Sequence, residues 1–91
     1  MEIDSSDPLF GYYAACLGNN VRIRILEICR NEVPQSHLHK LLKVSQGLIS
    51  GYVKEMIDLG LLSESRRKGI RVIKTEYQKI TFNILPFSSD A

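Results

Sequence analysis

The sequence predicts a single small domain of the α+β class, mainly helical with one β-hairpin. Two patterns support this prediction. Through residues 8–59, apolar residues recur at helical spacing, and glycine, asparagine, proline and serine interrupt the repeat. After residue 60 the spacing changes: Leu61-Leu62 begins a strand, Lys68-Gly69 turns the chain, and residues 70–74 return as a second strand. The expected order is helix, helix, short strand, helix, helix, strand, turn, strand, followed by a C-terminal segment.

Size and composition restrict the class of protein. Ninety-one residues, of which 44% are apolar, suit one globular domain. No apolar run approaches the roughly 20 residues needed to span a bilayer. The start of the chain is acidic, unlike a secretory leader, so we expect an intracellular protein without membrane contact. We expect a flexible acidic N-terminus over residues 1–7, a domain over residues 8–87 and a tail over residues 88–91.

Charge is distributed unevenly along the chain, although the formal net charge is only +2. Residues 1–20 contain three acidic side chains and no lysine or arginine, whereas residues 61–80 contain six basic and two acidic side chains. A concentrated positive segment beside a helix favours a polyanionic partner. The alternative is a basic hairpin that is merely well solvated.

Two helices are predicted in the first third of the sequence. Asp7-Pro8 combines an N-cap acceptor with proline at the first helical position, and Gly18-Asn19 would end that helix. Asn20 can cap a second helix, whose apolar stripe runs to about residue 29.

A second pair of helices, joined by a tight turn, is predicted in the middle. Val33 can add a short strand before a helix over about residues 35–43. Ser45 is a good N-cap for the next helix, because its oxygen can accept a backbone N–H two or three residues further on. The residues of that helix expected to point to the core are Ile49, Tyr52 or Val53, Met56, Ile57 and Leu59.

The last apolar segment, residues 75–87, fits two structures. Thr75 and Gln78 resemble a capping box, which favours a helix, and we predict a helix here. Alternation of Ile80, Phe82 and Ile84 fits a strand instead. In either case the segment is apolar enough to pack on the body of the protein or on a second subunit.

The two cysteines, Cys16 and Cys29, lie on the apolar sides of predicted helices and have no metal-binding spacing. We expect them to be small buried hydrophobic residues, and a disulfide is the alternative.

Three segments carry a more specific comparison: residues 17–26 read LGNNVRIRIL, residues 44–56 read VSQGLISGYVKEM, and residues 58–62 read DLGLL. In order and spacing they resemble the LGxxxRxxIL opening, the LSQSTVSxHLKxL recognition helix and the xxGLV step into the wing of ArsR-like winged helix-turn-helix transcription regulators. The resemblance covers about residues 17–77. It implies a winged-helix fold and binding to double-stranded DNA.

The resemblance also assigns roles to residues. The second helix of a helix-turn-helix lies in the major groove, with its first residues at the base edges. With the apolar stripe buried, the opposite face would present Ser45, Gln46, Gly47, Ser50, Gly51 and Lys54. Gln46 suits adenine, and Ser50 suits bases or phosphate. Wing residues Arg66, Arg67, Lys68 and Arg71 would contact phosphates, or one of them would enter a minor groove.

The two glycines on this face, Gly47 and Gly51, are poor helix formers, each costing about 1 kcal/mol relative to alanine. Their presence on an exposed face suggests a partner that approaches the helix closely. The alternative is that they merely loosen a surface helix.

Other features of the family are missing from this sequence. Val33 to Leu38, VPQSHL, replaces the family's Cys-x-Cys metal site, and His37 and His39 diverge on a helix, so we expect no metal and no other cofactor. The short segment 75–87 also replaces the family's long dimerising helix. We still expect a homodimer, because apolar residues are in surplus at both ends of the chain. The expected interface is Leu9, Phe10, Tyr13, Phe82 and Leu85.

No set of catalytic side chains is found, so an enzyme is not expected. Two alternatives to a sequence-specific regulator stay open: a winged-helix module that binds an acidic protein, and an architectural DNA binder without sequence preference.

Overall fold

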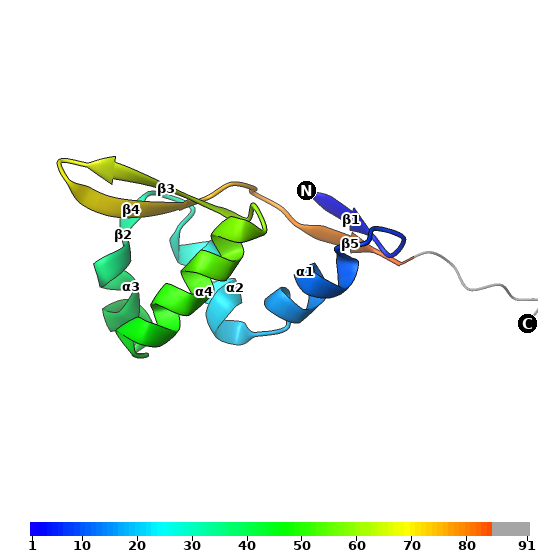
Figure 1. Ribbon diagram of the computed structural model, residues 1–91, viewed down its shortest axis with the longest axis horizontal. Helices are drawn as coiled ribbons and strands as arrows, with labels where there is room; N and C mark the ends of the chain where they lie inside the picture. Colours follow the sequence, from blue (N-terminus) through cyan, green and yellow to red (C-terminus); the bar gives the residue numbers. More distant parts are fainter. Residues whose placement is uncertain (85–91) are drawn as a thin grey trace, which may run out of the picture.

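The computed structural model describes residues 1–84, within which it has four helices and five strands (Figure 1). The predicted α+β class is confirmed. In chain order the elements are β1 (Glu2–Asp4), α1 (Phe10–Leu17), α2 (Asn20–Ile28), β2 (Val33–Pro34), α3 (Gln35–Leu42), α4 (Gln46–Asp58), β3 (Leu62–Arg67), β4 (Ile70–Thr75) and β5 (Thr81–Asn83).

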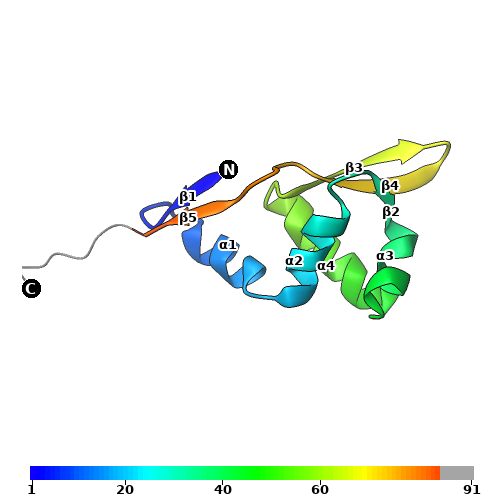
Figure 2. The ribbon, with the colours of Figure 1, turned by 180° about the vertical axis from the view of Figure 1, so that it is seen from behind.

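The strands form two separate sheets. In the first, β4 lies between β2 and β3 and is antiparallel to both, so the predicted hairpin gains a third short strand. In the second, β1 and β5 pair in parallel. Figures 1 and 2 show the β3–β4 hairpin projecting past α3 at one end of the molecule, while β1 and β5 lie beside α1 at the other end.

Two of the helices, α2 and α4, begin at a side-chain acceptor, although not always the predicted one, whereas α1 and α3 have no side-chain cap. Asn19, rather than Asn20, caps α2: its backbone is extended, and its Oδ1 accepts the N–H groups of Val21 and Arg22 at 2.8 and 3.2 Å. Asp7 Oδ1 accepts the N–H of Leu9 at 2.7 Å, but in a turn that precedes α1. An N-cap residue must have non-helical dihedral angles, which only Asn19 of the two asparagines has.

One hydrophobic core joins all four helices to both sheets. Thr75 and Tyr13 add hydrogen bonds at its edges: the Thr75 hydroxyl donates to the Leu26 carbonyl at 2.7 Å, and the Tyr13 hydroxyl donates to the Leu59 carbonyl at 3.0 Å. The buried side chains are Ile3, Tyr13, Cys16, Ile25, Cys29, Leu38, Ile49, Val53, Met56, Leu61, Leu62 and Ile73.

Two predictions for the ends of the chain are wrong. Residues 1–7 are not simply a flexible segment, because Glu2–Asp4 form β1 and Ile3 is 1% exposed. The segment after residue 75 is not a helix in its described part: Thr75 ends β4, so its hydroxyl bonds the Leu26 carbonyl instead of capping a helix, and Thr81–Asn83 form β5. Leu85 to Phe87 and the predicted tail lie outside the described residues.

The cysteines are buried and reduced, as predicted. Cys16 and Cys29 are free thiols, exposed by 1% and 0%. Burial raises the pKa of the Cys29 thiol to about 11. Burial also raises the pKa of the Cys16 thiol, against a smaller opposing effect of the Arg22 charge.

Because the thiolate is the reactive form, both cysteines should resist thiol reagents at pH 8 while the protein is folded. With Ellman's reagent we expect slow release of thionitrobenzoate from native protein and rapid titration of both thiols in urea. Fast labelling of native protein, at the rate of a small free thiol, would contradict the burial seen in the core.

Candidate nucleic-acid interface

The helix-turn-helix is formed by α3 and α4. Lys43 closes α3 in a left-handed conformation, with φ 56° and ψ 42°. Ser45 then begins α4, and its hydroxyl accepts the N–H of Leu48 at 3.2 Å, which confirms the predicted N-cap. Lys43 and Ser45 thus set the angle between the two helices within three residues.

One face of α4 is buried and the other is exposed. Ile49, Val53 and Met56 are buried in the core, as predicted, and Tyr52 and Ile57 are half-buried at its margins. The candidate DNA-contacting residues of α4 are all exposed: Ser45, Gln46, Gly47, Ser50, Gly51 and Lys54. The structure therefore brings these six residues together on one exposed face.

Gly47 and Gly51 are not required by the packing of the chain itself. A methyl group added at either position would meet no heavy atom within 4 Å. Neither glycine has positive φ, so both occupy ordinary helical backbone. The space above them is open, and α4 can be approached closely along this line.

A groove of about 310 Å³ separates the helix-turn-helix from the wing. Its lining includes three side chains of α3 that sequence reasoning missed, Gln35, Ser36 and His39. Gln46 Nε2 lies 3.3 Å from His39 Nε2, so the imidazole accepts from the Gln46 amide when that nitrogen is unprotonated. The signal in the sequence was the four-residue spacing of Gln35 and His39, which places both on one side of α3. The full lining is Gln35, Ser36, His39, Gln46, Ile49, Ser50 and Arg71.

The wing is a hairpin closed by a two-residue turn. Lys68 and Gly69 have φ of 53° and 80°, and two successive positive values are typical of the turn that matches strand twist. The predicted turn at Lys68-Gly69 is confirmed. Arg66 is tied to this turn, because its Nη1 donates to the Gly69 carbonyl at 3.0 Å. Arg66 and Lys68 are both exposed at the end of the hairpin.

The other two basic wing residues are held by carboxylates. Arg67 donates two hydrogen bonds to Glu32, of 3.0 and 2.6 Å, and Arg71 forms an ion pair with Glu64. The hydrogen bond from Arg67 also lowers the pKa of the Glu32 carboxyl group. The pair between Arg67 and Glu32 was not predicted, because the two residues are 35 positions apart in the sequence.

Charge also divides α4 along its length. Lys54 is the last basic residue of its exposed face, and Glu55 and Asp58 follow it, both exposed. Glu55 is paired with Arg22 at 2.7 Å, and the Arg22 guanidinium stacks 4.5 Å from the centre of the Tyr52 ring. The N-terminal half of α4, with its open N–H groups, is therefore the half suited to an anion.

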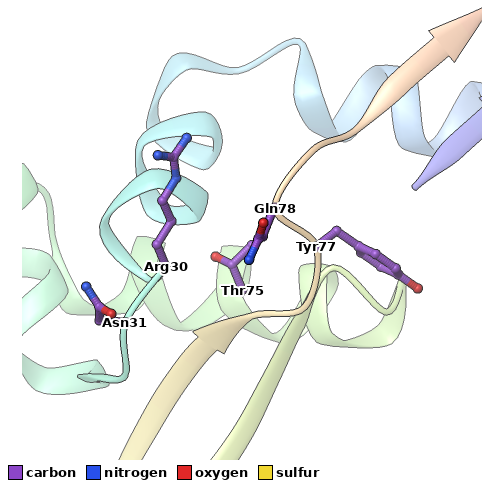
Figure 3. Close-up of a pocket in the computed structure, with 5 residues that line it drawn as sticks. All are labelled: Arg30, Asn31, Thr75, Tyr77 and Gln78. Carbon is purple, nitrogen blue, oxygen red and sulfur yellow. The ribbon is translucent and has the colours of Figure 1, made fainter.

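A second cavity, of about 440 Å³, lies between the end of α2 and the chain that follows β4. Figure 3 shows Arg30 and Asn31 on one side of it and Thr75 and Gln78 on the other. It shares no residue with the groove or with the wing turn.

Within residues 1–84 no cluster of three or more His, Cys, Asp or Glu side chains could hold a metal ion. Over the same residues, no helix is long and apolar enough to cross a membrane.

The structure places the residues expected at the dimer interface in different environments. Leu9 is 45% exposed, and Phe10 and Phe82 pack edge to face with ring centres 5.5 Å apart. Tyr13 is buried within the chain and bonded to Leu59, so it is unavailable to a partner. Leu85 lies beyond the described residues.

Comparison with solved structures identifies the class of fold. HlyU from Vibrio cholerae is 17% identical, covering 81% of this chain and 83% of its own, with a TM-score of 0.69. The transcriptional regulator HlyU from Vibrio vulnificus is 18% identical, covering 72% and 70%, with a TM-score of 0.65. A homodimeric winged helix-turn-helix DNA-binding domain, Mb0332 from Mycobacterium bovis, is 15% identical, covering 81% and 75%, with a TM-score of 0.63.

These likenesses show that the chain has the winged helix-turn-helix fold, as its resemblance to ArsR-like regulators implied. Mb0332 is itself described as a possible ArsR-family transcriptional regulator. No protein-family model matches the sequence, and no curated protein matches it.

Proposed function

We propose that this protein is a small transcription regulator that binds double-stranded DNA at specific sequences. One observation supports the proposal above the others: the exposed face of α4 has polar side chains and open glycines, with Leu48 (41% exposed) as the large apolar side chain beside them, and it is next to a basic hairpin. An α-helix fits the major groove, and a projecting basic hairpin suits the adjacent backbone or minor groove.

In this proposal the N-terminal half of α4 reads the bases. Gln46 and Ser50 line the groove beside α3 and can hydrogen-bond base edges. His39 holds the Gln46 amide from the side and so limits the orientations in which it meets a base. Lys54 and the N-terminal N–H groups of α4 would contact phosphate.

The wing would supply affinity rather than sequence information. Arg66 and Lys68 are exposed at its end, and neither has a carboxylate partner within residues 1–84. Contacts with phosphate release counterions, so the logarithm of affinity should fall with the logarithm of salt by about 0.9 for each contact. An affinity that does not change with salt would contradict the proposal.

We also propose that the protein acts as a homodimer inside the cell, with its two recognition helices reading half-sites about one DNA turn apart. The homodimeric state of Mb0332, a structural neighbour, supports this part of the proposal.

Replacing Gly51 by alanine tests whether this glycine allows DNA to approach α4 closely or only loosens the helix. The added methyl group meets no atom of the free protein, so the helix should become more stable by about 1 kcal/mol. If DNA approaches here, the same methyl group should weaken binding to the selected duplex several-fold. Urea unfolding and fluorescence anisotropy measure the two effects separately.

Gly11 provides the matched control, because it lies on α1 and a methyl group there also meets nothing within 4 Å. Gly11→Ala should stabilise the protein comparably and leave DNA affinity unchanged. A Gly51→Ala protein that is more stable and binds DNA as tightly as the original would show that the glycine has no role in DNA approach.

The alternative function is a winged-helix module that binds an acidic protein. The carboxylate partners of Arg67 and Arg71 favour it, because they show that the wing already accommodates carboxylates. Selection from random duplexes distinguishes the two functions. Enrichment of a palindrome supports the dimeric regulator, whereas retention of duplexes without enrichment would indicate an architectural binder, and no retention would favour the protein-binding module.

A further inference from the structure

The small sheet formed by β1 and β5 has two different edges. Thr81 N–H donates to the Met1 carbonyl at 2.8 Å, and Ser5 N–H donates to the Asn83 carbonyl at 2.8 Å. In a parallel pair these bonds use alternate residues of β5, so Thr81 and Asn83 face β1. The N–H and C=O of Phe82 therefore point to the opposite edge, where no strand of the described chain pairs with β5.

The outer edge of β1 is poorly suited to a further strand. Its two outward-facing residues, Glu2 and Asp4, are charged and exposed. The carbonyl of Asp4 already accepts the N–H of Asp7 at 2.9 Å, because the chain turns there. Charges and an early turn are common means of preventing edge-to-edge pairing.

The outer edge of β5 has the opposite character. Residues 80–84, ITFNI, carry no charge and are rich in β-branched and aromatic side chains, which favour strands. Strand alternation places Ile80, Phe82 and Ile84 on one face of the sheet, with buried Ile3 opposite Phe82. Ile84 is nevertheless 69% exposed, so this apolar face is covered around Ile3 and uncovered at its end.

We infer that β5 pairs antiparallel with β5 of a second copy, which gives a four-stranded sheet with the order β1-β5-β5-β1. The two-fold axis passes beside Phe82, so that each Phe82 N–H donates to the carbonyl of the other Phe82. Ile80 then lies opposite Ile84 of the second copy, and Ile84 becomes covered. An antiparallel pair of identical strands is self-complementary, as a two-fold dimer requires.

A two-stranded sheet is only marginally stable in water, and a third strand adds stability. The inference rests on the homodimer in the proposed function, and it assigns that dimer to a particular edge. It also differs from the expected interface: the backbone of β5 makes the contact, and Tyr13, which is buried within its own chain, takes no part.

Replacing Ile84 by proline tests the edge, because it removes an N–H that faces away from β1. Glu2→Pro is the matched control: it removes the corresponding outward N–H from β1. By sedimentation equilibrium of the full chain, we expect the original protein and Glu2→Pro to be dimers at about 20 µM, and Ile84→Pro to be a monomer. Circular dichroism of each variant should show unchanged helix content.

A dimeric Ile84→Pro protein would overturn the β5 interface, and so would a monomeric original protein at that concentration. DNA binding, measured on the same samples, is a separate readout. If Ile84→Pro is a monomer and still binds a single half-site, the proposed function stands. If the original protein is a dimer but does not bind DNA, the function is contradicted and the β5 interface is not.

Cross-linking gives a second test that does not depend on the proline variant. In the inferred register Thr81 lies opposite Asn83 of the second copy, with Cα atoms about 4.5 Å apart, close enough for a disulfide. Thr81→Cys/Asn83→Cys should form a covalent dimer with copper phenanthroline, and Thr81→Cys alone should not. Cys16 and Cys29 are buried and do not compete. Equal cross-linking of the single and double variants, or none in either, would reject this register.

Discussion

Replacing both Arg66 and Lys68 by glutamate is expected to lower the affinity for duplex DNA by roughly 100-fold near 0.1 M salt. Each residue is exposed at the end of the hairpin, and the proposed function gives each one a phosphate contact. Loss of a single contact costs close to a factor of ten at that salt, and glutamate adds repulsion. The slope of log affinity against log salt should also decrease by about 2.

The measurement is a salt titration of anisotropy with a labelled duplex from the selection. The matched control is Arg30→Glu/Lys79→Glu, which changes the net charge equally at the side of the molecule where Arg30 borders the second cavity (Figure 3). That control should change affinity only slightly through long-range electrostatics. Equal losses in both double variants would mean that total charge, and not the wing, determines binding.

Replacing Leu38 by alanine is expected to lower the free energy of unfolding by about 2–5 kcal/mol. Leu38 is the buried residue of α3, fully covered, and it supports the angle between α3 and α4. A cavity at this position would remove packing that the surrounding helices cannot replace. For a protein of this size such a loss is a large fraction of the total stability.

Leu41 on the same helix is the control for this substitution, because its side chain is 55% exposed. Leu41→Ala should change the free energy of unfolding much less, within about 0.5 kcal/mol, since surface changes away from special features have small effects. Urea unfolding followed by circular dichroism measures both variants. Similar losses for Leu38 and Leu41 would contradict the position of α3 relative to the core.

The parts of the fold that could be predicted depend on neighbours in the sequence. Ser45 caps α4, and Lys68-Gly69 turns the wing, because both structures use groups a few residues apart. The buried face of α4 follows from helical spacing alone. The exposed candidate residues of α4 follow from the same pattern, although their contact with DNA remains a prediction.

The parts that could not be predicted depend on residues far apart. The sequence around Thr75 resembles a helix cap, but in the structure the Thr75 hydroxyl donates to the carbonyl of Leu26, 49 positions earlier. β1 and β5 pair across almost the whole chain, with Glu2 opposite Thr81. The alternation of Ile80, Phe82 and Ile84 did fit a strand, but so short a segment also fitted a helix, and the three residues of β1 carry no pattern that distinguishes a strand. The pairing of the two strands with each other decides between these alternatives.

The acidic partners of the wing have a consequence for how DNA competes for it. Glu32 and Glu64 occupy the guanidinium groups of Arg67 and Arg71 as intramolecular anions. A phosphate that takes either arginine must displace a carboxylate, which offsets part of the gain in binding free energy. The counterions released on binding come from the DNA, so the salt dependence should still count every arginine that contacts a phosphate, whereas the affinity should be lower than that count suggests.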